Sequence, residues 1–191
     1  MGKVIAGMSM SLDGFINDSN GSVDKLYSDF SEMHDAPSFK AMIKHTGAAI
    51  MGRHVYEMAD PFQWADDDYE FQTPIFVLTY TPPEKYPKGN GKLSFTFVTD
   101  GIKNAISQAL RAAGDKDVQV IGGADTIQEC LNAAACDELQ IDIMPVLLGR
   151  GIRLFENIDS ERIKLERIKV EETTPARTSI TFRVTKTNPE A

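Results

Sequence analysis

The feature that most constrains the fold is a pattern that occurs twice, in which a short apolar run leads through glycine into a helical run. Gly47 to Met51 (GAAIM) leads into Gly52-Arg53-His54, and Val118 to Ile121 (VQVI) leads into Gly122-Gly123. The apolar runs have the length and bounds of buried strands. Strands that alternate with helices in this way form a mostly parallel sheet, so the pattern indicates an α/β domain.

The remaining segments agree with this class. Apolar or alternating runs predict strands at 3–10, 75–79, 93–99 and 139–148, and helical spacing predicts helices at 37–45, 55–59, 102–113 and 125–133. Two alternating runs between 163 and 185 flank Thr174-Pro175-Ala176 and predict a hairpin. We expect one domain over 1–191, a three-layer α/β/α fold whose mostly parallel central sheet ends in a C-terminal antiparallel hairpin. No repeat or linker divides it.

Composition excludes several classes of function. The 191 residues carry a net charge of -8 without a basic run, which argues against nucleic acid as a partner. The two cysteines are too few for a disulfide framework and predict a reducing compartment, so we expect a cytoplasmic protein. No run reaches the ~18 apolar residues of a membrane span, and the start of the chain is unlike a signal peptide. The three histidines are too scattered to predict a metal site.

The two glycine turns are candidates for phosphate binding. A helix that begins just after glycine presents unpaired N–H groups and the positive end of its dipole to an anion. Arg53 adds a guanidinium that can bind phosphate oxygens in pairs. The alternative is a tight connection without a ligand, since neither turn matches the G-x-G-x-x-G or Walker patterns.

Five motifs occur along the chain in one order. They are SLDGFI (11–16), MGRHVYE (51–57), IFVLT (75–79), VIGGADTI (120–127) and DELQIDIMPVLLGRGIRLF (137–155). This arrangement resembles the dihydrofolate reductase-like superfamily, closest to the C-terminal reductase domain of the bifunctional riboflavin-biosynthesis deaminase/reductase. The resemblance implies an NADPH-dependent oxidoreductase and a homodimer. The implied substrate is pterin-like or pyrimidine-like, of the riboflavin-pathway 5-amino-6-(5-phosphoribosylamino)uracil type.

The resemblance also implies a set of cofactor-binding residues. Gly52, Arg53 and His54 would contact the phosphates, with Arg53 binding the 2′-phosphate, and Leu78 and Thr79 would border the adenosine. The residues that would line the diphosphate and nicotinamide are Gly122, Gly123, Ala124, Asp125, Thr126 and Ile127. The sequence departs from the family at Val55, where a threonine usually helps to bind the diphosphate.

Two aspartates are candidates for contact with the substrate. Asp13 lies in SLDGFI, a segment that borders the nicotinamide in the resembled family, and it is our candidate catalytic residue, although an Asp-Gly turn also explains it. Asp35 has an offset from MGRH similar to that of the acid of dihydrofolate reductase, but it also suits a helix N-terminus. The chain lacks the H-x-E and P-C-x-x-C zinc signature of deaminases, so the resemblance extends to the reductase half alone. A non-catalytic nucleotide-binding or regulatory protein with the same fold remains the alternative.

Overall fold

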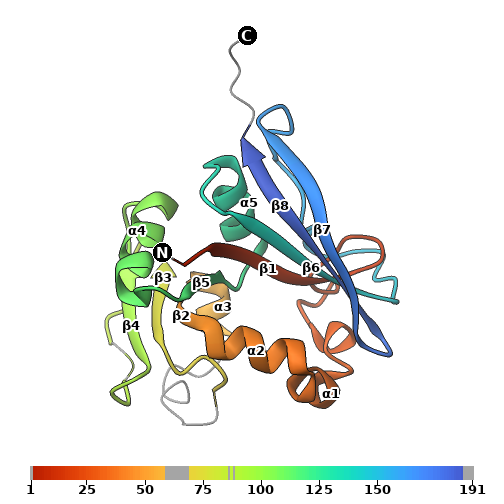
Figure 1. Ribbon diagram of the computed structural model, residues 1–191, viewed down its shortest axis with the longest axis horizontal. Coiled ribbons are helices and arrows are strands. Elements are labelled where there is room, and N and C mark those ends of the chain that lie inside the picture. Colours follow the sequence, from red (N-terminus) through yellow and green to blue (C-terminus); the bar gives the residue numbers. More distant parts are fainter. Residues whose placement is uncertain (1, 59–68, 86, 88, 187–191) are drawn as a thin grey trace.

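A computed structural model describes residues 2–58, 69–85, 87 and 89–186. In these residues eight strands form one sheet in the order β4-β3-β2-β5-β1-β6-β8-β7 (Figure 1). The strands are β1 (Val4–Ser11), β2 (Thr46–Gly52), β3 (Pro74–Leu78), β4 (Ser94–Val98), β5 (Asp117–Val120), β6 (Glu138–Met144), β7 (Ile163–Thr174) and β8 (Arg177–Lys186). Neighbours from β4 to β6 pair in parallel, whereas β8 is antiparallel to both β6 and β7. The mostly parallel sheet and the terminal hairpin are therefore as predicted.

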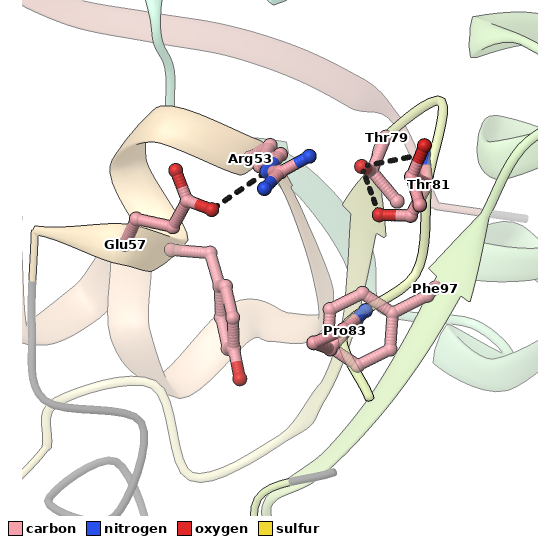
Figure 2. Close-up of a pocket in the computed structure, with 7 residues that line it drawn as sticks. Arg53, Glu57, Thr79, Thr81, Pro83 and Phe97 are labelled. Atoms are coloured by element: carbon pink, nitrogen blue, oxygen red, sulfur yellow. Dashed lines mark hydrogen bonds and ion pairs between the residues drawn. The ribbon is translucent and has the colours of Figure 1, made fainter. Parts of the chain in front are cut away.

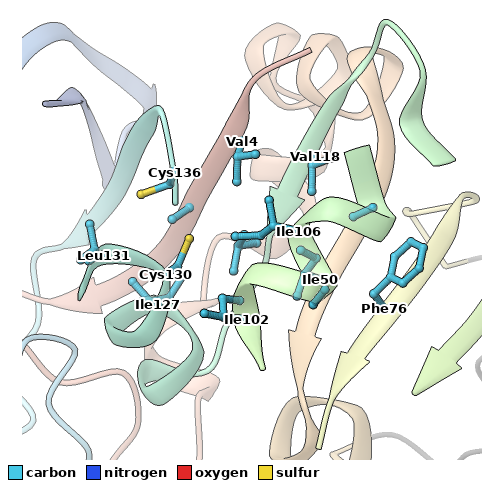
Figure 3. Close-up of a cluster of buried hydrophobic side chains, with 14 of the residues drawn as sticks. Val4, Ile50, Phe76, Ile102, Ile106, Val118, Ile127, Cys130, Leu131 and Cys136 are labelled. Carbon is cyan, nitrogen blue, oxygen red and sulfur yellow. The ribbon is translucent and has the colours of Figure 1, made fainter. Parts of the chain in front are cut away.

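Helices cover both faces of the sheet, because its central strands are apolar on both sides. They are α1 (Phe30–Asp35), α2 (Pro37–His45), α3 (Arg53–Glu57), α4 (Ile102–Ala113) and α5 (Ala124–Asn132), with a short 3-10 helix at Asp24–Leu26. On one face, Ile50 and Val118 pack with Ile106 of α4 and Ile127 of α5 (Figure 3). On the other face, Met51 packs in a second cluster with residues of α2 and α3. These two clusters give the three layers expected from the sequence.

Two predicted elements differ from the structure by more than one residue at a boundary. The strand predicted to reach residue 148 ends at Met144, because Pro145 has no N–H for the sheet and the N–H of Val146 turns back to the carbonyl of Met144 at 2.8 Å. The helix predicted at 55–59 begins earlier, at Arg53, and runs to Glu57. Ala59, the predicted end of that helix, lies outside the described residues.

A buried ion-pair cluster links the first residue of the hairpin strand β8 to other parts of the fold. The guanidinium of Arg177, at the start of β8, is fully buried and donates to both carboxylate oxygens of Asp29, at 2.7 and 3.1 Å. It also donates to the Ser9 hydroxyl at 2.7 Å and approaches Asp142 at 3.4 Å. Burial alone would raise the pKa of Asp29, but hydrogen bonds from Arg177 and Thr174 lower it below its ordinary value. The cluster thus joins β1, β6 and β8 to the segment before α1.

Candidate functional site

The two glycine turns meet at the edge of the sheet where the parallel strands end. β2 and β5 are neighbours with Ile50 opposite Val120, so their C-terminal ends lie together. The N–H of Gly52 donates to the carbonyl of Gly122 at 2.8 Å. A Cβ on Gly52 would lie only 2.5 Å from the hydroxyl oxygen of Thr126, so this close approach requires glycine. Segments about 70 residues apart therefore form one surface.

Gly122 and Gly123 have different surroundings, although they are adjacent and joined by a cis peptide bond. Gly122 has a φ of +110°, and a Cβ there would approach the sulfur of Met8 to 2.9 Å. At Gly123 a Cβ would meet only a methyl carbon of Val55, at the ordinary contact distance of 3.7 Å. The fold therefore demands glycine at the first position, whereas at the second the protein leaves room for a side chain.

The helix that follows begins without a side-chain cap. Gly123 is the N-cap of the nine-residue α5, and no side-chain hydrogen bond caps this end. The N–H groups of the first turn are thus available to an anion. Among the residues predicted here, Asp125 is exposed, whereas Ala124, Thr126 and Ile127 are buried. Ile127 belongs to the core, so only its backbone remains for ligand contact.

A second part of the site is a shallow pocket between α3 and the ends of β3 and β4 (Figure 2). The residues that line it are Arg53, Tyr56, Glu57, Thr79, Thr81, Pro83 and Phe97. The Nε–H of Arg53 donates to Glu57 at 2.6 Å, and both side chains are about half exposed. The hydroxyl of Thr79 donates to the carbonyl of Thr81 at 3.0 Å. The cavity volume is only about 20 Å³, so the pocket does not enclose a nucleoside, but the cation and the hydroxyl at its mouth can contact a phosphate group.

The structure brings some predicted residues together and leaves others apart. Gly52 lies against the glycine pair, and Arg53 and Thr79 share the pocket. His54 is exposed outside the lining of that pocket, and Leu78 packs against the larger core. The site predicted from the sequence did not include Glu57 or the further lining residues Tyr56, Thr81, Pro83 and Phe97. Glu57 had a signal, since a carboxylate four residues after an arginine on a helix is a favourable pair.

Asp13 joins the loop after β1 to the loop after β6. Its carboxylate accepts hydrogen bonds from the Ser11 hydroxyl at 2.6 Å and from the N–H groups of Gly149 and Leu148 at 2.7 and 3.1 Å. These bonds, that of Ser11 foremost, lower the pKa of Asp13 to about 2. Asp13 therefore stays ionised near neutral pH, and its catalytic role stays a prediction. Asp35 is exposed and pairs with Lys40 at 2.9 Å.

Within the described part of the chain, no three or more histidine, cysteine, aspartate or glutamate side chains are grouped so that they could hold a metal ion. None of the described helices has the length and apolarity to cross a membrane.

Comparisons with known proteins identify the family of this chain. The family model of the RibD C-terminal domain matches residues 2–177, and the chain belongs to this family. YwjB of Bacillus subtilis (strain 168), an uncharacterised protein, is 27% identical over 163 residues, which cover 83% of this chain and 86% of YwjB.

Two solved structures show the same fold. A Shewanella sp. PV-4 protein, provisionally named for riboflavin biosynthesis, has a TM-score of 0.73 at 29% identity over 96% of this chain and 99% of its own. Dihydrofolate reductase from Enterococcus faecalis, solved with NADP(H), has a TM-score of 0.57 at 18% identity over 95% of this chain and 96% of its own. The dihydrofolate reductase-like fold predicted from the sequence is therefore confirmed.

Proposed function

We propose that the protein is an NADPH-dependent oxidoreductase that reduces a pyrimidine-like or pterin-like small molecule, with the riboflavin-pathway type as the first candidate. The observation that supports this most is the contact between Gly52 and Gly122 beside the uncapped start of α5. The backbone groups of the two glycine turns thus lie at the edge where open α/β sheets bind ligands. Family membership supports the reductase class.

The residues present fit a dinucleotide phosphate. The room for a Cβ at Gly123 would be taken by the diphosphate, which the first N–H groups of α5 would bind. Arg53 would bind the 2′-phosphate at the mouth of the pocket that Thr79 also lines. When bound, NADPH supplies the hydride, while the protein orients the two reactants and supplies the electrostatic environment.

A second candidate function is a nucleotide-binding or regulatory protein without turnover. The observation that favours it is Val55, whose methyl group faces both glycines where the family usually offers a hydroxyl. The two candidate functions can be distinguished by mixing the purified protein and NADPH with a panel of dihydrofolate, pyrimidine and small carbonyl substrates. Loss of NADPH absorbance supports the reductase, whereas binding without oxidation supports the alternative.

Gly123→Ala tests the proposed diphosphate site directly, with Gly122→Ala as its control. Because the protein has room for a Cβ at Gly123, the first variant should keep its unfolding temperature and lose most of its NADPH affinity. Gly122→Ala should instead unfold at a lower temperature, because its Cβ meets Met8 and its φ is positive. Unchanged NADPH binding by a folded Gly123→Ala protein, measured by fluorescence titration, would contradict the proposed site.

The partner and location follow from the same proposal. We propose that the protein is cytoplasmic, because it has few cysteines and NADPH is the reductant in that compartment. We also propose that this member of the family assembles as a homodimer.

A further inference from the structure

Glu57 contacts the residue on which the cofactor preference depends. It lies one helical turn after Arg53 and accepts a hydrogen bond from Nε at 2.6 Å. The guanidinium has three nitrogens, and this bond uses Nε alone, so the edge formed by the two terminal nitrogens stays available. In Figure 2 the guanidinium lies between the Glu57 carboxylate and the turn of Thr79 and Thr81. The available edge thus borders the pocket.

The helix dipole contributes little at this place. α3 has five residues, too few for a substantial macrodipole, so binding of an anion here depends on the side chain of Arg53. That side chain is about half exposed and has many rotamers in solvent. A contact that restricts these rotamers before the ligand arrives lowers the entropic cost of binding.

We infer that Glu57 is a positioning residue that sets the preference for NADPH over NADH, by holding Arg53 at Nε so that its terminal nitrogens face the 2′-phosphate. This inference rests on the proposed function and adds to it a residue that would not itself touch the 2′-phosphate. A simple charge effect predicts the opposite sign, because removal of a carboxylate beside Arg53 should strengthen the binding of a phosphate. An experiment can therefore distinguish positioning of Arg53 from a simple charge effect.

The experiment compares Glu57→Ala and Glu57→Gln in the full chain, with NADPH and NADH titrated separately by fluorescence. The amide oxygen of glutamine still accepts from Nε, so Glu57→Gln should keep the preference for NADPH or increase it. Alanine has no acceptor, so Glu57→Ala should bind NADPH about three- to tenfold more weakly, with NADH affinity unchanged. Arg53→Ala gives the reference value for complete loss of the preference.

A matched control is Asp159→Ala, which removes a carboxylate from the Nε of Arg162, a 3.1 Å pair of similar exposure outside the pocket lining. It should leave both affinities unchanged. Stronger NADPH binding in both Glu57 variants, or the same preference as wild type in both, would overturn the inference while the proposed function stands. Failure of the wild-type protein to bind either dinucleotide would overturn both.

Discussion

At the scale of single residues, Val55 provides a test of the proposed diphosphate site. Its methyl carbon lies 3.7 Å from the Cβ positions of both Gly122 and Gly123, so a hydroxyl here would face the same space. Val55→Thr should tighten NADPH binding by about one decade, the size of a hydrogen bond to a charged group. Isothermal titration calorimetry measures the change, and Val55→Ala controls for altered space. Equal affinities of the threonine variant and wild type would show that the diphosphate lies elsewhere.

Asp13 gives a prediction with a definite pH dependence. Its pKa of about 2 lies below the ordinary value of 3.8, so its bonds stabilise the fold above about pH 4 and are lost as the pH falls toward 2. The unfolding temperature of wild type should therefore fall more steeply over this range than that of Asp13→Asn, as differential scanning fluorimetry would show. Parallel curves would mean that the carboxylate does not hold the 148–149 loop.

The catalytic role proposed for Asp13 has a separate readout. An ionised carboxylate can orient a substrate but does not donate a proton, so Asp13→Asn should lower kcat to the same extent across pH 5 to 9 while NADPH affinity stays intact. A loss of thermal stability with unchanged kcat would assign Asp13 to the loop alone.

The residues of the site could be predicted where they belong to a local motif. Gly52, Arg53, Gly122 and Gly123 follow apolar strands directly, so a turn at the end of a strand marks them. Thr81 and Phe97 could not be found in this way, because they reach the pocket only when β3 and β4 pair beside β2. Pocket walls that come from one helix and two strands leave no characteristic spacing in the sequence.

At the scale of elements, the C-terminal hairpin was predicted but not what holds it. Arg177 forms a hydrogen bond with Asp29, 148 residues earlier in the chain, and no local pattern marks such a pair.

The sequence did not predict the helix α1. Pro37 is typical of the first turn of a helix, so the predicted helix began there and corresponds to α2. Ala36 has an extended ψ of 134° that separates the two helices, so Pro37 begins α2 while Phe30 and Met33 belong to a helix of their own.

Arg177→Met should destabilise the protein by about 3–5 kcal/mol, because it leaves the carboxylates of Asp29 and Asp142 without their buried cation. Urea denaturation measures the change. Asp29→Asn in the Arg177→Met background should recover part of this loss, although Asp29→Asn alone destabilises the wild type. Additive effects of the two substitutions would show that the pair is not coupled.

At the scale of the whole molecule, the edge strand β7 offers the surface for the proposed homodimer. Leu165, Arg167, Val170 and Glu172 share one face, since they lie opposite alternate residues of β8. Leu165 is 48% exposed and Val170 is 53% exposed. A two-fold axis through Val170, perpendicular to the strand, would bring Arg167 of one copy toward Glu172 of the other, with the two Val170 side chains facing each other between these pairs.

Val170→Glu should therefore shift the protein from dimer to monomer in light scattering after gel filtration, with dimer affinity weakened at least about tenfold, because two like charges would face each other at this position. Lys103→Glu, a surface change on α4, is the control. A variant that stays dimeric would move the interface to another face, and a monomeric wild type would contradict the homodimer itself.

The central place of β1 in the sheet also determines when the chain can fold during its synthesis. Val4 pairs with Val118 and Ile5 with Glu138, so β1 gains its two neighbours only after the segment from residue 117 to residue 144 has been translated. Until then its apolar side chains have no strand beside them. Pairing between segments this far apart in the sequence is slow to form. Nascent chains that are arrested before residue 138 should remain sensitive to protease, whereas chains extended past the β8 strand should become resistant at once.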